Sequence, residues 1–290
     1  HNPDRKAPRV YGIPMKALST NCLYYNAYRV RIEMAAELGE MVDPEWARKA
    51  EHLRQAINTV LWTGDRYRFL TGPFGASDRQ EALGNAYTQL FGVADETRGR
   101  AVLGAQTVMP AGVPAVWPDY PRYRKEGSAD FSRHAGTVWP QIQGMWADAA
   151  ARRGDVAMLW HELSQLAAHA VRDRQFAEIY HPLTGAVYGG LQERGGRGIG
   201  LWESQPRQSW AASAYLRMLF SGVAGIEPSR QGVTFEPHVP EALGDVEISN
   251  LRIRRANVSL TIRRADGAPR KRFIPWSEFE RTALTVELGR

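Results

Sequence analysis

The chain has 290 residues, of which 43% are hydrophobic, and it carries a formal net charge of +6 at pH 7. This length and composition allow a sizeable buried core and exclude an intrinsically disordered chain. A membrane helix needs roughly 20 apolar residues in a row, and charge interrupts even the most apolar stretch, Ala211 to Ile226. We therefore expect a soluble protein without a membrane partner.

The usual markers of cellular compartment leave the location open. The single cysteine, Cys22, has no partner for an internal disulfide. The first residue is His1, and the residues after it lack the charged and then apolar regions of a signal peptide. Either a leader was removed or the chain begins within a longer protein, so both the cytoplasm and the periplasm remain open.

The positive charge comes mostly from arginines that are spread along the chain. Clusters occur only at residues 252–255, 263–264 and 270–273. A nucleic-acid-binding protein gathers its basic residues on one face. We therefore interpret the arginines as a solvated surface and expect no nucleic-acid partner, although the C-terminal clusters keep nucleic-acid binding as a third class of function.

The first half of the sequence predicts two helical hairpins. The four helices expected there span residues 21–38, 43–62, 77–91 and 95–108. Asp43, Ser77 and Asp95 are residue types that cap helix N-termini, and Pro44 suits the first helical turn. Gly39 ends the first helix, and the links within both hairpins are short.

The second half predicts a third hairpin and a last helix. The hairpin spans residues 138–153 and 156–172, and the last helix spans residues 207–223. Residues 109–136 are rich in Pro, Gly, Tyr and Trp, and residues 185–206 are rich in glycine. Both stretches lack helical periodicity, so we interpret them as long loops, the first of functional type. Repeated helix pairs with long loops on one side are typical of a toroid or solenoid.

From about Gly232 the pattern changes to short alternating runs, which predict β-strands. The runs are residues 233–236, 246–248, 251–253 and 258–262, with 284–288 as a further candidate. We therefore expect a helical catalytic domain over residues 1–228 and a small antiparallel β module over residues 229–290.

Four segments resemble the (α/α)6-barrel glycosidases, nearest the enzymes of glycoside hydrolase family 63 and the amylo-1,6-glucosidases. They are Ser19 to Tyr28, Gly136 to Pro140, Glu178 to Gly185, and Gln208 to Arg217. The resemblance covers roughly residues 5 to 263 in the right order and implies a mainly α fold, an (α/α)6 toroid followed by the β module. Six hairpins need more helices than the sequence predicts, so we expect the C-terminal part of a ring, completed by a companion chain or an upstream segment.

The resemblance also implies the catalytic groups. Glycoside hydrolysis needs two carboxyl groups, one to protonate the leaving oxygen and one to activate water or attack the sugar. By resemblance, Glu178 is the general base of an inverting reaction, with Glu193 and Glu203 as alternatives on the next loop. The family's acid precedes the segment that begins at Ser19, where Asp4 is the available aspartate. An acid upstream of His1, or a different chemistry, remains the alternative.

Sugars bind to aromatic rings by stacking and to planar polar groups by hydrogen bonds. The expected substrate-binding residues are Asn21, Tyr24, His134, Trp139, Gln192, Trp202 and Gln208. The first long loop supplies further residues of these types, namely Trp117, Asp119, Tyr120 and Tyr123. The alternative for each is a structural role, because Trp and Tyr also fill cores well.

Other motifs carry little weight. Residues 195–200 imitate a dinucleotide fingerprint, but no strand precedes them and no helix follows. His161 and Glu162 begin a zinc-protease pattern in which Gln165 stands where the second histidine belongs. Cys22 has no evident base nearby. We therefore expect no metal and no cofactor.

The sequence thus predicts an inverting glycoside hydrolase that cleaves an α-linked sugar in an oligosaccharide or glycoside, with glucose as the first candidate. An α-rhamnosidase or a trehalase of the same fold is an alternative, because fold alone does not decide the substrate. A non-catalytic carbohydrate-binding remnant is a further alternative.

Overall fold

The computed structural model describes residues 14–123, 128–194, 196–263 and 270–289, and the part it describes is mainly α. Seven α-helices lie in these residues: α1 (Leu18–Glu37), α2 (Pro44–Ala56), α3 (Ala82–Leu90), α4 (Glu96–Ala105), α5 (Pro140–Arg152), α6 (Val156–Asp173) and α7 (Ser209–Arg217). Short π-helical turns, Ile57–Leu61 and Met218–Val223, extend α2 and α7. Each helix corresponds to one predicted from the sequence.

Local capping explains several helix boundaries. Asp43 and Asp95 accept hydrogen bonds of 2.9 and 2.8 Å from backbone N–H groups in the first turns of α2 and α4. Asp155 caps α6 in the same way at 3.0 Å. Gly39 follows α1 with a φ of +69°, which glycine adopts without strain. The predicted caps at Asp43 and Asp95 and the predicted stop at Gly39 are confirmed, and Asp155 is a further cap that the structure adds.

The predicted helix cap at Ser77 is wrong. Ser77 ends strand β3 (Gly75–Ser77), and α3 begins only at Ala82, after strand β4 (Gln80–Glu81). Strand β3 pairs with β2 (Leu70–Gly72), and β4 pairs with β5 (Val116–Trp117). Because these backbone groups are used in strand pairing, the chain stays extended until Ala82.

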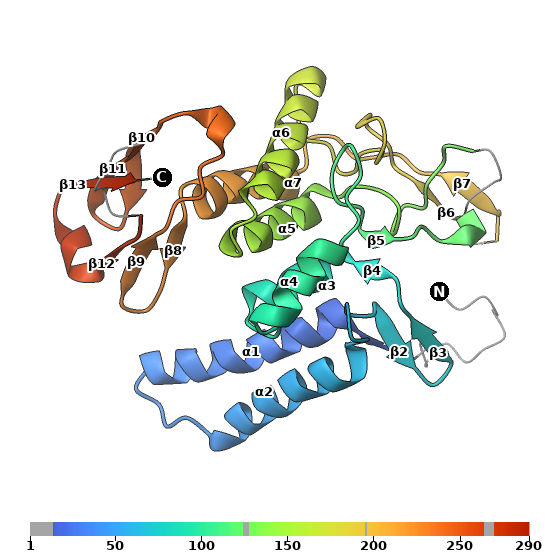
Figure 1. The fold of residues 1–290 in the computed structure, drawn as a ribbon, viewed down its shortest axis with the longest axis horizontal. Helices are drawn as coiled ribbons and strands as arrows, with labels where there is room; N and C mark the ends of the chain where they lie inside the picture. Colours follow the sequence, from blue (N-terminus) through green and yellow to red (C-terminus); the bar gives the residue numbers. More distant parts are fainter. Residues whose placement is uncertain (1–13, 124–127, 195, 264–269, 290) are drawn as a thin grey trace.

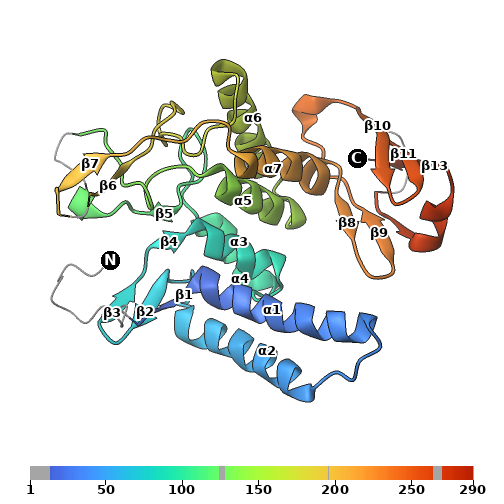
Figure 2. The same ribbon diagram turned by 180° about the vertical axis from the view of Figure 1, so that it is seen from behind.

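Four helices lie side by side in the order α1, α3, α5 and α7, and each packs on the next (Figures 1 and 2). Helix α2 packs on α1, α4 on α3, and α6 on α5. The long loops gather near the N-terminal ends of the four helices, on the right in Figure 1. Strands β1 (Lys16–Ala17), β6 (Leu191–Glu193) and β7 (Ile199–Leu201) lie at this end, with β2 to β5.

Close backbone approach holds α5 and α7 together. A Cβ atom at Gly144 on α5 would lie 2.8 Å from the Cβ atom of Ala214 on α7. The largest fully buried side chain of the core, Trp146, is also on α5. Glycine therefore brings the two helices near enough for the loops at their N-terminal ends to meet.

Two three-stranded sheets form the C-terminal region, at the other end of the helices (Figure 1). One has the order β12 (Arg272–Pro275), β9 (Gly232–Phe235) and β8 (Ile226–Pro228), and the other β10 (Val246–Ile253), β11 (Ala256–Arg263) and β13 (Ala283–Gly289). The sequence pattern predicts an antiparallel module, and this is wrong for one pair of strands. Strand β13 pairs in parallel with β11. Runs 246–248 and 251–253 form one strand with an irregularity at residues 248–251.

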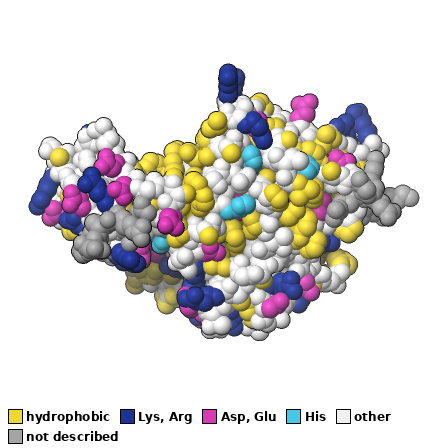
Figure 3. Space-filling model, turned by 45° about the horizontal axis from the view of Figure 1, so that its top comes forward, with side chains coloured by type: hydrophobic (Ala, Val, Ile, Leu, Met, Phe, Trp, Pro, Cys, Tyr) yellow, Lys and Arg dark blue, Asp and Glu magenta, His cyan; other side chains and the backbone are white. Residues whose placement is uncertain are grey.

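Acidic partners accompany much of the basic charge in these sheets. Arg255 lies 3.4 Å from Glu280, and Arg263 lies 2.8 Å from Glu247. On the face seen in Figure 3, Lys and Arg side chains lie mainly toward the edges, with hydrophobic side chains between them.

None of the described helices combines the length and apolar character of a membrane span.

A buried carboxylate joins the helices to the first C-terminal sheet. Asp148 on α5 is fully buried and lies 3.1 Å from Arg152 and 2.5 Å from Arg217 of α7. Arg152 also reaches Glu227 of β8 at 2.9 Å. These ion pairs tie α5, α7 and β8 together.

Glu162 on α6 is a second fully buried carboxyl group, and burial raises its pKa to about 8, against partial opposition from Gln143 and the N–H of Val113. The unfolded chain releases this proton near pH 4.5, but the folded chain holds it until about pH 8. Between these values the free energy of unfolding therefore falls as pH rises, by up to about 1.4 kcal/mol per pH unit.

We expect Glu162→Gln to remove this pH-dependent fall in the free energy of unfolding. The free energy of unfolding of the variant should therefore increase relative to that of wild type as pH rises from 4.5 to 8. Urea unfolding of both proteins across this range measures the effect, and the difference between them isolates Glu162 from the histidines. A difference that does not change with pH would contradict the prediction.

Candidate active site

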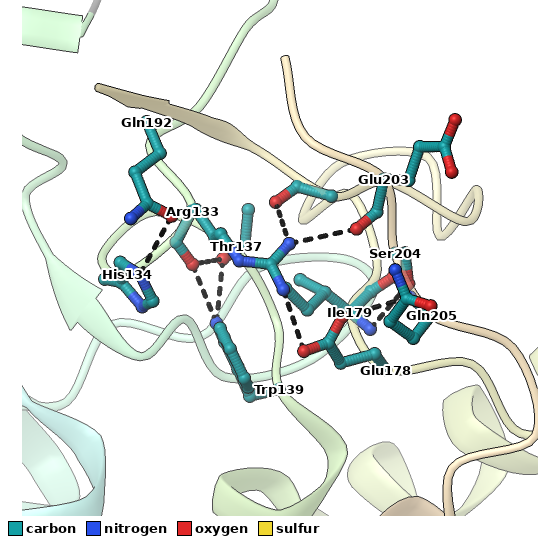
Figure 4. A network of polar contacts seen from close by, with 11 residues as sticks. Arg133, His134, Thr137, Trp139, Glu178, Ile179, Gln192, Glu203, Ser204 and Gln205 are labelled. Carbon is teal, nitrogen blue, oxygen red and sulfur yellow. Dashed lines mark hydrogen bonds and ion pairs between the residues drawn. The ribbon is translucent and has the colours of Figure 1, made fainter. Parts of the chain in front are cut away.

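Glu178 lies in the segment after α6, near the N-terminal ends of α5 and α7, and its side chain is buried (Figure 4). Its Oε1 atom accepts a hydrogen bond of 2.8 Å from Nη2 of Arg133. Its Oε2 atom accepts one of 3.0 Å from the backbone N–H of Gln205. This carboxylate is therefore enclosed by the protein and held at both oxygens.

Arg133 connects Glu178 to the glycine-rich loop. Its Nη1 atom donates to the backbone oxygen atoms of Gly189 at 2.7 Å and Glu203 at 3.2 Å. The sequence interpretation missed this residue, because it assigned the arginines to a solvated surface. The available signal was its position three residues before the Gly136 to Pro140 segment.

An aromatic platform lies beside this ion pair. The rings of His134 and Trp139 are stacked with centroids 5.7 Å apart, and Trp210 of α7 lies 6.2 Å from Trp139. The indole N–H of Trp139 donates to the backbone oxygen of Arg133 at 2.8 Å. An aromatic face of this kind can stack on the C–H groups of a sugar. Trp210 was missed, although it lies inside the segment Gln208 to Arg217.

His134 is a hydrogen-bonding group on this platform. Burial, with a smaller contribution from the charge of Arg133, lowers its pKa, and its hydrogen bond to Gln192 opposes the shift. The two side chains meet at 3.2 Å between Nε2 and Oε1. The structure therefore brings together three of the predicted substrate-binding residues, His134, Trp139 and Gln192.

A cavity of about 710 Å³ opens beside Gln192. It is lined by Gln192, Glu193, Arg194, Arg197, Leu201, Trp202, Glu203 and Gln205. This volume falls within the range of small-molecule sites. Of the alternative bases, Glu193 pairs with Arg122 of the first long loop, and Glu203 is exposed at the cavity. Trp202, another predicted substrate-binding residue, lines the same cavity as Gln192.

A family model for the mannosylglycerate hydrolase MGH1-like glycoside hydrolase domain matches residues 2–211. The chain belongs to this family. The resemblance to six-hairpin glycosidases that the sequence motifs indicate is thereby confirmed. A search of curated proteins finds no match.

Solved structures share the fold of this glycoside hydrolase domain. A sialidase matches with a TM-score of 0.66 and 15% identity, over 83% of this chain and 23% of its own. A family 63 mannosylglycerate hydrolase from Thermus thermophilus, in complex with Tris, matches with a TM-score of 0.52 and 17% identity, over 71% of this chain and 45% of its own. The chain thus spans less than half the length of either protein.

The structure does not bring the side chains of three predicted substrate-binding residues, Asn21, Tyr24 and Gln208, into the described contacts of the Glu178 ion pair. Asn21 donates to the backbone oxygen of Ala17 at 2.7 Å and lines a separate cavity of about 160 Å³ next to α2. Tyr24 is exposed on α1. Gln208 precedes α7, and its N–H binds Phe176 at 2.8 Å. Asp4 lies outside the described residues.

Asp119 organises the turn that carries Arg133. Its carboxylate accepts hydrogen bonds from the backbone N–H groups of Tyr120 at 2.8 Å, Ser132 at 2.9 Å and Gly136 at 3.0 Å, and from the Ser132 hydroxyl. It is buried. With this many donors, Asp119 acts within the protein and is not free to bind a sugar.

Gly189 allows the glycine-rich loop to pass close to the strand that leads to Glu203. A Cβ atom at Gly189 would overlap the backbone oxygen of Trp202. We therefore expect Gly189→Ala to push the two segments apart and to lower the free energy of unfolding by about 1–3 kcal/mol, as measured by urea unfolding.

Gly104→Ala is the matched control for this substitution. Gly104 lies on α4, and a Cβ atom there would meet nothing within 4 Å. Since alanine favours helix over glycine by up to about 1 kcal/mol, we expect this variant to be as stable as wild type or more so. Equal losses in the two variants would show that the contact at Trp202 is not the cause.

Proposed function

We propose that this chain supplies the general base of an inverting glycoside hydrolase that acts on an α-linked sugar. The observation that carries the proposal is the enclosed Glu178 carboxylate, held by Arg133 and Gln205 beside the Trp139 platform. A carboxylate in this position can take a proton from water as the water attacks the sugar. Trp139, His134 and Gln192 orient the sugar, and Asp4 is the candidate proton donor.

The substrate class follows from two sources. The family 63 resemblance favours an α-glucoside, and the similar structure from Thermus thermophilus is described as a mannosylglycerate hydrolase. An α-mannoside is therefore tested beside α-glucosides, trehalose and an α-rhamnoside.

The test is proton NMR of these glycosides during incubation with the protein. An inverting enzyme releases the β-anomer of the sugar first, before mutarotation. Early release of the α-anomer would contradict inversion, because it indicates a retaining reaction. Binding of a sugar without hydrolysis would favour the carbohydrate-binding alternative over an enzyme.

We also propose that the four neighbouring helices α1, α3, α5 and α7 are consecutive inner helices of an (α/α)6 ring. In support, Leu23, Val30, Met34 and Leu38 leave an exposed apolar stripe along α1. Their spacing places them on one side of the helix, and such a stripe favours a further packed element.

We expect an upstream segment or a companion chain to cover the stripe. Light scattering and binding of a dye for apolar surfaces test this. A monodisperse monomer that binds no dye would contradict it.

A further inference from the structure

Arg133 is bonded on both its backbone and its side chain to parts of the site. Its backbone oxygen accepts hydrogen bonds from the Trp139 indole at 2.8 Å and the Thr137 hydroxyl at 2.6 Å. Its guanidinium donates to Glu178 at 2.8 Å and lies 5.4 Å from the centroid of the Trp139 ring. One residue therefore contacts both the carboxylate and the aromatic platform (Figure 4).

Burial makes this arrangement sensitive to the shape of the side chain. The side chains of Arg133 and Glu178 are only 10% and 9% exposed. A buried charge that loses its partner is strongly destabilised. A guanidinium is a planar fork, so one nitrogen can bind Glu178 while the other binds the backbone oxygen atoms of the glycine-rich loop. A lysine keeps the charge but cannot make these contacts together.

We propose that Arg133 is a positioning residue that fixes the Glu178 carboxylate relative to the Trp139 ring. It sets the distance between the group that activates water and the surface that holds the sugar, and it does not itself touch the reacting atoms. This role rests on the proposed function of Glu178. Thr137 assists, because its hydroxyl hydrogen bonds both to the Arg133 backbone oxygen and to the Trp139 indole, which are 2.6 and 3.1 Å away.

Carboxyl labelling with a carbodiimide and an amine, read by mass spectrometry, tests the contact without any substrate. In wild type, we expect slow labelling of Glu178. In Arg133→Gln, labelling of Glu178 should rise by about tenfold or more, while the buried carboxylates Asp119 and Asp148 stay protected. Unchanged labelling of Glu178 would overturn the proposal.

Arg79→Gln is the matched control for the labelling. Arg79 also binds backbone oxygen atoms, those of Pro118 at 2.6 Å and Asp119 at 3.2 Å, and it lies 5.3 Å from the Tyr120 ring centroid. Its described contacts include no carboxylate, so Glu178 should stay protected in this variant. If Arg133→Gln exposes all three carboxylates, that variant has lost its fold, and Arg133→Lys is used in its place. We again expect labelling of Glu178 alone to rise. If labelling of Glu178 does not rise in Arg133→Lys, the proposal is overturned.

Kinetics test the positioning role on the glycoside that wild type hydrolyses. We expect Arg133→Lys to lower kcat by about 100-fold with little change in KM, because a small misplacement of a reacting group has an effect of this size. A change in KM alone, or wild-type kcat, would overturn the role. If wild type hydrolyses no glycoside, the proposed function fails, whereas the labelling still decides whether Arg133 holds Glu178.

Discussion

Replacing Glu178 by Gln is expected to lower the rate of glycoside hydrolysis by roughly 10³-fold. General base catalysis contributes about 10²–10⁴-fold, and an amide cannot take the proton from water. Gln keeps the size of the side chain and an oxygen that can accept from Arg133. The measurement is kcat for wild type and variant on the same glycoside, with the anomer of the product followed by proton NMR.

Glu203→Gln is the control for the loss of a carboxylate at this site. Glu203 lines the cavity beside Gln192, but its contact with Arg133 is through its backbone oxygen. We expect the substitution to affect KM more than kcat. A large loss of kcat in Glu203→Gln with near wild-type kcat in Glu178→Gln would exchange the roles of the two residues. Circular dichroism and Tm of both variants exclude unfolding as the cause.

Asp148→Ala is expected to lower the free energy of unfolding by about 3 kcal/mol, the lower end of the effect of breaking a buried ion pair. Asp148 is fully buried between Arg152 and Arg217. Its loss removes the ion pair with Arg217 that joins α5 to α7 and the ion pair with Arg152 within α5, and it leaves a void at the helix interface. The effect is at the lower end because the two arginines are about a third exposed and can reach water.

Urea unfolding at neutral pH measures this loss, with Glu227→Gln as the control. Glu227 binds the same Arg152 at 2.9 Å but is 36% exposed. Exposed ion pairs contribute about 0–1 kcal/mol, so the control should differ little from wild type. Equal losses in the two variants would show that burial of Asp148 is not what makes its ion pairs important.

The sequence predicts most successfully the contacts between groups that are three or fewer residues apart in the chain. Asp43 and Asp95 cap helices through backbone groups two or three residues later. These bonds form within one turn of the chain, so residue type and spacing are sufficient to predict them. The same holds for the order of the helices and for the alternating strands of the C-terminal region.

Elements paired over longer separations were predicted less well. Ser77 has the chemistry of a helix cap, yet strand pairing keeps its segment extended. Likewise, the alternation in β11 and β13 predicts strands but not their parallel pairing, because the direction depends on how the chain returns between them. Propensity is a local preference, and tertiary hydrogen bonds override it.

The sequence by itself determined the helical hairpins, the family resemblance and the choice of Glu178 as a candidate base. Only the tertiary structure identified Arg133 as its partner, 45 residues away in the chain, and Trp210 as a neighbour of Trp139. An isolated arginine in a loop has the same sequence signal whether it is solvated or buried. Its role is decided by the chain that folds over it, because burial makes an ion pair strong enough to hold a carboxylate in place.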